Sequence, residues 1–447
     1  MRRLVPIGLA VLVVAAAFLI SPNFRRVRSP DSTPYAGDFL HEWIGGYIVR
    51  AGDRTKLYDR RYAAALQHDA QVVGFEFQPD GFFPIVYPPF YYVLVSPLSA
   101  LPFQTAAALW AALSLACLAA SLALLGRAAR PGASLDLIAP AGVDETSSRV
   151  WAVARSWAVL PAVASVPVIE NLVSSQKGAF LLLILTTTFL LMRRGYRFAA
   201  GFAFGFQAFK PQLAIVIPLA MLAKREWRFV AGTLSSLSGL ASLSLAVGRV
   251  PCADYLRFMT GVAEYVGAQP AYLHREHCLY GFFTLLAGGP TTGARLATLA
   301  SSAVTLWLLA RLLSGRLDPE RPRFLAQFSG LVLATVLLSP HFLTYDLTIL
   351  LLPLWLTAIL LLRGFFPLSH RRAALWILVA LYAAASLSPL LAKRIGVQIS
   401  TPVMVALLAL LSRAEESPAV PLAGEKPDAA DDRVRSPSSR EGSSPCP

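Results

Sequence analysis

The sequence predicts an all-α polytopic integral membrane protein with about ten full spans plus one re-entrant half-helix pair. Of its 447 residues, 55% are hydrophobic and 15% are charged, and the mean hydropathy is +0.56. A soluble protein of this length does not need so much apolar surface. The net charge is +14, but Lys and Arg fall in short clusters between apolar runs, as the positive-inside rule produces. We therefore interpret the charge as a topology signal and expect no nucleic-acid partner.

The N-terminal region combines an apolar segment with a long polar loop. Residues 4–20 follow two arginines and resemble a signal sequence, but no small-x-small cleavage site follows, so we expect an uncleaved first span. A first outer loop then covers 21–102, with short helices expected at 39–49 and 59–70. Phe39, Trp43 and Tyr47 form a stripe on the first helix, which we expect to lie flat in the lipid interface. Five prolines in 81–102 exclude a regular spanning helix there and predict an interfacial or re-entrant segment.

The later apolar runs alternate across the membrane if the basic clusters between them are cytoplasmic. A second outer loop is expected at 249–292. Every basic cluster then lies on the cytoplasmic face except two, Arg25/Arg26/Arg28 and Lys393/Arg394. After the first span, the expected spans are 103–126, 150–169, 178–192, 229–248, 295–313, 324–339, 345–362, 373–391 and 397–412.

Residues 198–223 need a different solution. This run is apolar and long enough to cross once, yet basic clusters flank it on both sides. Lys210-Pro211 in its middle would break a helix. Two half-helices that dip into the membrane and return, with Lys210 near the tip, satisfy both the charge rule and the proline.

Residues 1–412 form one expected transmembrane domain, and 413–447, rich in Pro, Ser, Glu and Arg, form an expected disordered cytoplasmic tail. Both termini are then cytoplasmic. Cys252 and Cys278 share the second outer loop, where a disulfide can persist, and we leave their pairing open. His274 and His277 flank Glu276 in YLHREHC. A histidine pair at i and i+3 is weak support for a metal site, so we expect no metal and no cofactor.

Charged and polar residues from five separate places converge on the expected outer face. Charges near a membrane are costly unless they pair or act. They either form ion pairs that stabilise helix ends, which is the simpler interpretation for Glu170 and Lys177, or they build a site. Asp59 and Arg54 fit capping and a tight turn. The converging residues are Asp38, Glu42, Glu170, Lys177, Lys210, His341 and Asp346.

Each candidate has a structural and a functional interpretation. Asp38 either caps the helix that follows it or acts as a general base towards an attacking hydroxyl. Lys210 at a hairpin tip suits a phosphate, or it snorkels without a ligand. His341 either donates to a phosphate or glycosyl oxygen or simply ends a helix. Asp346 either orients His341 or an arginine, or caps the returning helix.

Five segments together resemble a known family. They are DFLHEWIGGYIVRAGDRTKLYD, VYPPFYYVLVSPLSALP, SSQKGAFLLLILTTTFLLMRRG, AFKPQLAIVIPLAML and LLSPHFLTYDLTILLLPL. In their order and spacing, over roughly residues 1–362, they resemble the multi-span glycosyltransferases of the GT-C fold. In particular, they resemble the bacterial polyprenyl-phosphate-mannose-dependent mannosyltransferases of glycosyltransferase family 87.

The resemblance implies a hexosyltransferase of the bacterial inner membrane with its active site facing outward. Its donor would be a polyprenyl-phosphate sugar among the membrane lipids, its acceptor a lipid or glycan hydroxyl, and its mechanism an inverting displacement. The family's outer-loop aspartate, which acts as base, corresponds to Asp38. The family's K-P tip and P-H pair correspond to Lys210 and His341, which would contact the donor phosphate and position the substrates. The other expected substrate-binding residues are Asp346, Glu42, Gln176, Lys177 and Tyr87.

One position departs from the family pattern. Where such chains often carry Gly-Gln-x-Asn, this one has SSQKGAF, which keeps Gln176 but places Lys177 and Gly178 after it. Mannose is therefore the family default and not a deduction. The competing hypotheses are a polytopic transporter or lipid-linked sugar flippase, for which no matching halves are evident, and a noncatalytic scaffold. No protein partner follows from the sequence.

Overall fold

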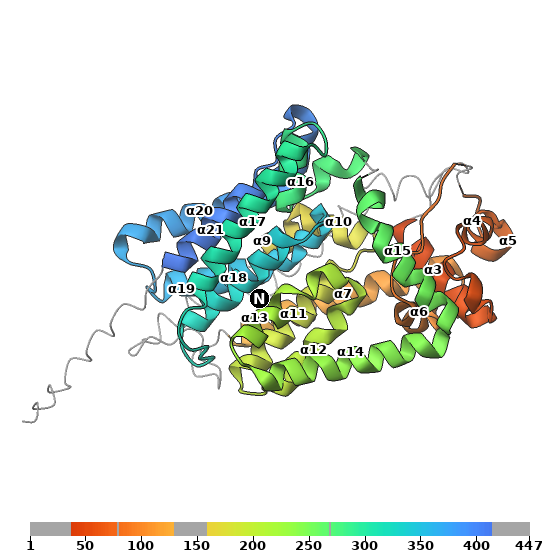
Figure 1. Cartoon of the computed structure of the whole chain (residues 1–447), viewed down its shortest axis with the longest axis horizontal. Helices are drawn as coiled ribbons and strands as arrows, with labels where there is room; N and C mark the ends of the chain where they lie inside the picture. The colour runs from red at the N-terminus through yellow and green to blue at the C-terminus, as the bar shows by residue number, and fades with distance from the viewer. Residues whose placement is uncertain (1–36, 78–79, 129–158, 268–269, 414–447) are drawn as a thin grey trace, which may run out of the picture.

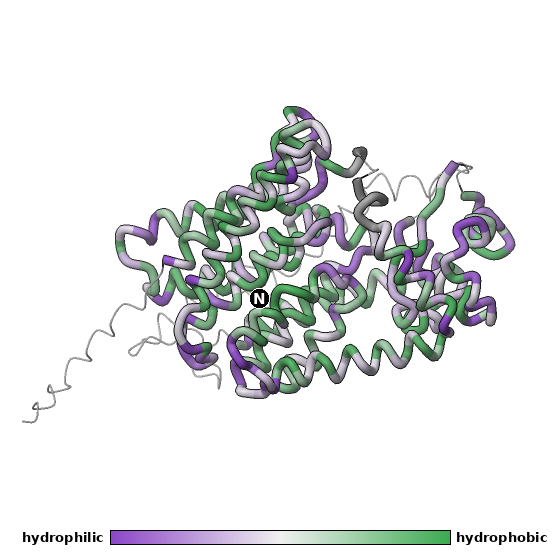
Figure 2. Tube along the Cα trace, in the orientation of Figure 1, coloured by the Kyte–Doolittle hydropathy of each residue, from purple (hydrophilic) through white to green (hydrophobic). Residues whose placement is uncertain are grey.

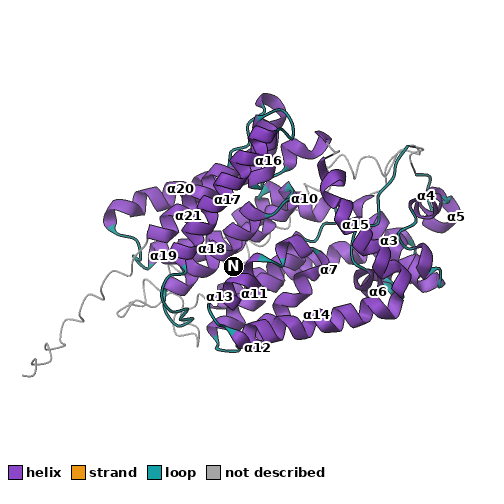
Figure 3. Cartoon of the chain, in the orientation of Figure 1, coloured by secondary structure: helices purple, strands orange, loops and turns teal. Residues whose placement is uncertain are grey.

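The computed structural model describes residues 37–77, 80–128, 159–267 and 270–413 (Figure 1). These residues form α-helices and short 3-10 helices without a strand (Figure 3), and one isolated antiparallel bridge joins Glu276 to Leu343. The all-α fold is therefore confirmed. The expected first span at 4–20 and the expected tail after Arg413 lie outside the described residues.

The first described part of the chain contains four short α-helices and two 3-10 helices before the first long helix. Asp59 caps α4, because its carboxylate accepts hydrogen bonds from the backbone N–H groups of Arg61 (2.9 Å) and Tyr62 (3.1 Å). This confirms the capping role expected from the sequence. The elements are α3 (Gly37–Ala51), η1 (Arg54–Lys56), α4 (Arg60–His68), α5 (Ala70–Val73), α6 (Pro89–Val95), η2 (Leu98–Ala100) and α7 (Phe103–Ala128).

Helix α3 packs inside the protein, so the expectation that its aromatic stripe lies in the lipid interface is wrong. Phe39 is fully buried and stacks on Trp110 of α7, with ring centroids 5.1 Å apart. Trp43 is also buried and donates its indole N–H to the carbonyl of Leu101 (3.2 Å). An apolar helix face can pack against lipid or against other helices. In this protein, the apolar face of α3 packs against α6 and α7.

The middle of the chain contains a sharp bend. Helices α10 and α11 meet at 118° across a short break, and residues 150–158 of the span expected there lie outside the described residues. The elements are α9 (Val159–Ala164), α10 (Val166–Val173), α11 (Gly178–Arg193), α12 (Arg197–Gly205), η3 (Phe206–Phe209), η4 (Pro211–Leu213), α13 (Val216–Ala223) and α14 (Trp227–Val247).

Helices α12 and α13 are the expected half-helix pair. Lys210 lies at the break between η3 and η4. Arg197 Nη1 at the start of α12 lies 2.9 Å from Glu226 Oε2, just after α13, so the two half-helices begin and end at the same place. Gly201 lets α12 approach α14 closely, since a Cβ there would lie 1.9 Å from the carbonyl oxygen of Phe229.

The last part of the chain starts with the region expected to be the second outer loop, which is largely helical. Cys252 and Cys278 are both free, so the disulfide left open above does not form. Cys278 instead caps α16, with its sulfur accepting the N–H of Gly281 (3.4 Å). The elements are α15 (Arg249–Gly267), η5 (Pro270–Arg275), α16 (Leu279–Leu286), α17 (Thr292–Leu312), α18 (Arg323–Leu338), η6 (Thr344–Leu350), α19 (Leu351–Leu362), α20 (Leu368–Ile395) and α21 (Ser400–Arg413).

The described residues contain five helices that are long and apolar enough to cross a membrane. They are α7, α14, α17, α20 and the continuous run η6–α19, and the bent pair α10–α11 makes six if it counts as one span. The expected count of ten is therefore not confirmed; α18 and α21 are apolar but shorter. Apolar residues cover much of these helices (Figure 2), and Leu299, Trp307 and Trp376 are exposed, as lipid-facing side chains are.

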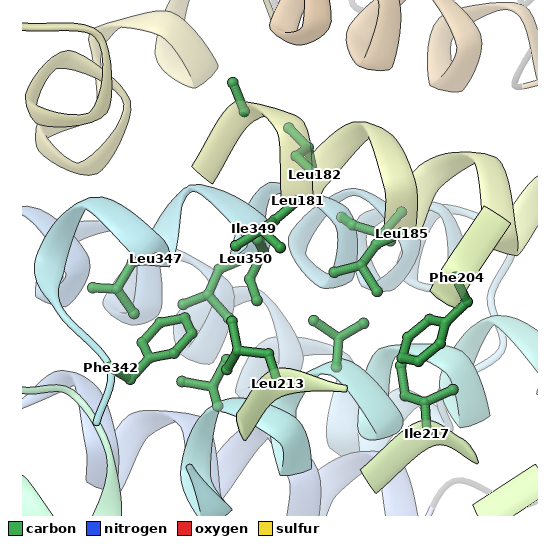
Figure 4. Packing of buried hydrophobic residues seen from close by; sticks show 14 of the residues in the cluster. Leu181, Leu182, Leu185, Phe204, Leu213, Ile217, Phe342, Leu347, Ile349 and Leu350 are labelled. Atoms are coloured by element: carbon green, nitrogen blue, oxygen red, sulfur yellow. The ribbon is translucent and has the colours of Figure 1, made fainter. Parts of the chain in front are cut away.

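The apolar core brings three distant elements together. Leu181, Leu182 and Leu185 come from α11, Phe204, Leu213 and Ile217 from the broken hairpin, and Leu347, Ile349 and Leu350 from η6 (Figure 4). Between membrane helices such contacts stabilise by close packing. The same three elements carry Lys177, Lys210 and Asp346 at their ends or breaks. The packing of the core therefore determines where those charges meet.

Candidate active site

The turn between α10 and α11 positions two of the candidate residues. Ser175 in this turn has φ 53°, a left-handed conformation that is uncommon for a residue other than glycine. Trp110 holds the turn by donating its indole N–H to the carbonyl of Ser175 (2.9 Å). Gln176 and Lys177 follow directly, and both contact side chains of α3.

Asp38 lies in the first turn of α3 and is half-buried. Gln176 Nε2 donates a hydrogen bond to Asp38 Oδ2 at 2.6 Å. Among the described residues, the partner of the Asp38 carboxylate is therefore a neutral side-chain amide. Burial raises the pKa of the Asp38 carboxyl above its ordinary value, while the positive charge of Lys177 and the hydrogen bond from Gln176 act in the opposite direction. A carboxylate with these properties is a stronger base than an exposed one.

Glu42 lies one helical turn after Asp38 and forms a buried ion pair with Lys177. The hydroxyl of Tyr91 also donates to the Glu42 carboxylate. The ammonium of Lys177 lies 4.5 Å from the centre of the Tyr87 ring, close enough for a cation–π contact. Glu42 and Lys177 are 0% and 1% exposed, so each neutralises the other inside the protein.

Lys210 and Asp346 form a second buried pair, with Nζ 2.5 Å from Oδ1. Asp346 therefore neither orients His341 or an arginine nor caps a helix, as the sequence had suggested, because the break in the hairpin brings Lys210 to it. Lys210 Nζ also lies 5.3 Å from the centre of the Tyr345 ring. Phe209, next to Lys210, packs on Tyr87 and Tyr91 and so joins the two pairs.

The segment after η5 supplies two further pairs. Arg275 pairs with Glu170 and lies over the Tyr345 ring, 5.9 Å from its centre. Glu276 contacts Nδ1 of His341 and accepts the backbone N–H of Phe342 (2.8 Å). Glu276, not Asp346, thus fixes the position of His341. Glu170 and Lys177, which the simpler interpretation assigned to ion pairs at helix ends, do form such pairs, but with Arg275 and Glu42.

The ring of His277 binds hydroxyl groups. Its Nδ1 lies 2.6 Å from Ser400 Oγ, and its Nε2 lies 3.1 Å from Thr344 Oγ1. The described parts of the chain hold no group of three His, Cys, Asp or Glu side chains that could bind a metal ion. The YLHREHC segment contributes Arg275 and Glu276 to the charged region and not a metal site.

The nine residues that the sequence predicted to converge or to bind substrate lie in or beside one region, which we call the polar cluster. Sequence reasoning missed Tyr91, Arg275 and Tyr345, although each is adjacent to or within a segment considered above. Tyr91 shares the proline-rich run with Tyr87, and Tyr345 precedes Asp346. The charged members of the polar cluster are Asp38, Glu42, Glu170, Lys177, Lys210, Arg275, Glu276, His341 and Asp346.

Asp38 differs from the other acids of the polar cluster. Within the described residues, each of the other four carboxylates pairs with a basic side chain. Asp38 instead receives a neutral amide and keeps some exposure. A carboxylate tied to a cation is a poor proton acceptor, because the pair favours the ionised form. Asp38 is therefore the one carboxylate of the polar cluster that no described cation neutralises by direct pairing.

Comparison with known proteins gives one match. The family model described as glycosyltransferase family 87 matches residues 85–340, which is more than half of the chain. The matched region contains Tyr87, Gln176, Lys177 and Lys210 and ends one residue before His341. No curated protein and no solved structure matches the chain.

Proposed function

Because the chain belongs to glycosyltransferase family 87, we propose that it transfers a hexose from a polyprenyl-phosphate donor to a hydroxyl group of a lipid or glycan. The family makes it a membrane glycosyltransferase and so favours transfer over the transporter and scaffold hypotheses. Mannose is the hexose we expect from the resemblance. We further propose that the reaction occurs at the extracytoplasmic face of a bacterial inner membrane, with both termini in the cytoplasm.

The observation that carries the mechanism is the contrast between Asp38 and the other acids of the polar cluster. Asp38 accepts a hydrogen bond from an amide and is partly exposed, whereas Glu42 is fully buried and paired with Lys177. Burial raises the pKa of both carboxyls, so the partner and the exposure distinguish Asp38. A general base needs a carboxylate that is reachable by substrate and not neutralised by a permanent cation. Asp38 meets both requirements, and Gln176 fixes the direction of its carboxylate.

The proposed step is a single displacement. The acceptor oxygen attacks the anomeric carbon while Asp38 takes the proton from the acceptor hydroxyl. The bond from the anomeric carbon to the phosphate oxygen breaks, and its electron pair leaves with polyprenyl phosphate. Attack opposite the leaving group inverts the anomeric configuration. The glycosyl group thus replaces the proton on the acceptor oxygen, the proton passes to Asp38, and no further reactant is needed.

The leaving phosphate needs positive charge close by, because negative charge develops on its oxygen in the transition state. Lys210 and Arg275 both lie over the Tyr345 ring, and Lys177 lies over Tyr87. Arg275 has the most accessible side chain of the three, at 26% exposed against 8% for Lys210 and 1% for Lys177. We assign the direct phosphate contact to Lys210 and Arg275, with Lys177 acting at longer range.

Other polar residues would act by position. Glu42 holds Lys177 and would act through it. Asp346 holds Lys210 at the break of the hairpin. His341, fixed by Glu276 and one-third exposed, would donate to a substrate oxygen. Tyr87 holds the ammonium of Lys177 over its ring and would act through it.

The experiment that tests the proposal uses purified protein in lipid, a membrane-lipid extract as acceptor pool and a panel of radiolabelled donors. The panel contains polyprenyl-phosphate mannose, polyprenyl-phosphate glucose and a nucleotide-activated mannose. We expect label to move from a polyprenyl-phosphate donor to a new product with wild type and not with Asp38→Ala. Transfer from the nucleotide sugar alone, or no transfer from any donor, would contradict the proposal.

A further inference from the structure

His41 is a buried histidine of α3 whose ring nitrogens make no hydrogen bond of normal geometry to the described residues. Its side chain is 7% exposed, and within the described residues neither Nδ1 nor Nε2 has a partner. Its ring stacks on Tyr87, with centroids 5.7 Å apart and planes inclined by 22°. The same Tyr87 ring contacts the ammonium of Lys177. A backbone contact with Asp38 acts on the ring, but neither nitrogen makes a hydrogen bond of normal geometry, so the imidazole lies inside the polar cluster with capacity for a ligand.

This arrangement is unfavourable for folding alone. Leaving a buried donor or acceptor without a partner costs about 1–3 kcal/mol. An apolar side chain of similar size would pack on Tyr87 without that cost. The fold therefore gains stacking from the ring at this position and gains nothing from its nitrogens.

The position of His41 on α3 relates it to the proposed base. Residues three and four apart share a helix face, so His41 and Glu42 lie on the same side of α3 as Asp38. Phe39 and Trp43 face α7 on the other side. A group that reached Asp38 would thus pass one helical turn from the His41 ring.

We propose that His41 binds a hydroxyl group of the hexose that is transferred from the donor, an inference that rests on the proposed function. Burial lowers the pKa of His41 well below its ordinary value, and the charge of Lys177 acts in the same direction, while the weak backbone contact with Asp38 opposes them. A neutral imidazole offers one donor and one acceptor. A sugar hydroxyl also donates and accepts, whereas a phosphate oxygen only accepts. The unused pair of nitrogens therefore matches a hydroxyl better than a phosphate.

The test compares His41→Leu and His41→Gln with wild type in lipid nanodiscs, and His68→Leu, an exposed histidine on α4, is the matched control. We expect His41→Leu to unfold at the same or a higher temperature, because it removes unsatisfied polar atoms. Its kcat/KM for polyprenyl-phosphate mannose should fall about tenfold, the value of one lost hydrogen bond. Gln retains a donor and an acceptor and should restore part of the rate.

Deoxy donors identify the contact. We expect one of the 2-, 3-, 4- or 6-deoxymannosyl donors to lower kcat/KM in wild type but to cause no further loss in His41→Leu. Equal losses in both proteins for every deoxy donor would overturn the proposal. So would a loss that appears only in the KM of the acceptor, or a fall in unfolding temperature with kcat/KM unchanged. If wild type transfers no hexose from any polyprenyl-phosphate donor, the proposed function itself fails, and the His41 assignment fails with it.

Discussion

Gln176 and Asp38 stand 138 positions apart in the sequence, and the amide of the first donates to the carboxylate of the second at 2.6 Å. The turn that carries Gln176 is held by Trp110 and contains the left-handed Ser175. The amide orients the carboxylate without neutralising it, which a lysine at the same place would do. The two residues thus link the bend between α10 and α11 to the chemistry proposed for α3.

Replacing Gln176 should change the pH dependence of transfer. Only ionised Asp38 can accept a proton, so the rate should fall as the pH falls through the raised pKa of Asp38. The hydrogen bond from Gln176 lowers that pKa, and its loss in Gln176→Leu should raise it further. We therefore expect the acid limb of kcat/KM to move to higher pH. The control is Gln71→Leu on the exposed surface of α5; an unmoved limb in Gln176→Leu would contradict the assignment of Asp38 as base.

The buried pair of Glu42 and Lys177 should be strongly coupled in stability. Either Glu42→Gln or Lys177→Met leaves one charge buried without its partner, which typically costs about 3–5 kcal/mol of unfolding free energy. The double variant removes both charges and should be less destabilised than the sum of the two single variants. Denaturant unfolding of all four proteins in the same detergent measures the coupling. Strict additivity would mean that the two charges do not depend on each other.

Lys210→Met should weaken the use of the donor. If Lys210 contacts the leaving phosphate, its loss should lower kcat/KM for the donor by about 10²-fold, as the loss of one charge-stabilising group does in other enzymes. Lys224→Met is the matched control, because Lys224 donates to the backbone carbonyl of Leu313 in the loop after α17 and not to the polar cluster. Equal effects of the two substitutions would remove Lys210 from the site.

Gly178→Ala should disturb the start of α11. A Cβ at Gly178 would lie 2.6 Å from the carbonyl oxygen of Tyr345 and 2.9 Å from Asn171 Oδ1. Overpacking of this kind costs about 1–3 kcal/mol, and movement of the adjacent Gln176 and Lys177 should also lower the transfer rate. Gly239→Ala in α14 has nothing within 4 Å of the new Cβ. It should leave stability unchanged or slightly raised, and a similar loss in both variants would contradict this packing.

Much of the architecture follows from local properties of the sequence. Hydropathy locates the long helices, Asp59 predicts the start of α4, and Lys210-Pro211 predicts the break between α12 and α13. The family membership follows from an ordered set of short motifs. The convergence of Asp38, Lys177 and Lys210 is expected from the topology that the basic clusters imply, in which alternating spans bring loop ends to one side of the membrane. The structure brings the three residues into one cluster, and the topology itself stays a prediction.

The partners inside the polar cluster could not be predicted in this way. Lys210 and Asp346 are 136 positions apart, and their pairing depends on how the broken hairpin packs against η6. Sequence proximity favoured His341 as the partner of Asp346, but Glu276 reaches His341 first. The prediction that α3 lies in the lipid interface is wrong for a related reason, because an apolar stripe packs equally well against lipid and against a neighbouring helix. Cys252 and Cys278 share a region of sequence, but Cys278 is buried at the start of α16.

The most direct test of the account is the transfer rate of Asp38→Asn measured together with its affinity for polyprenyl-phosphate mannose. Asn preserves the shape of the side chain and cannot accept the proton. Asp318→Asn, which alters an acid in the loop between α17 and α18, is the matched control. We predict that Asp38→Asn binds the donor as wild type does and transfers at least about 100-fold more slowly, while Asp318→Asn is unaffected. A transfer rate of Asp38→Asn within about tenfold of wild type would show that Asp38 is not the base.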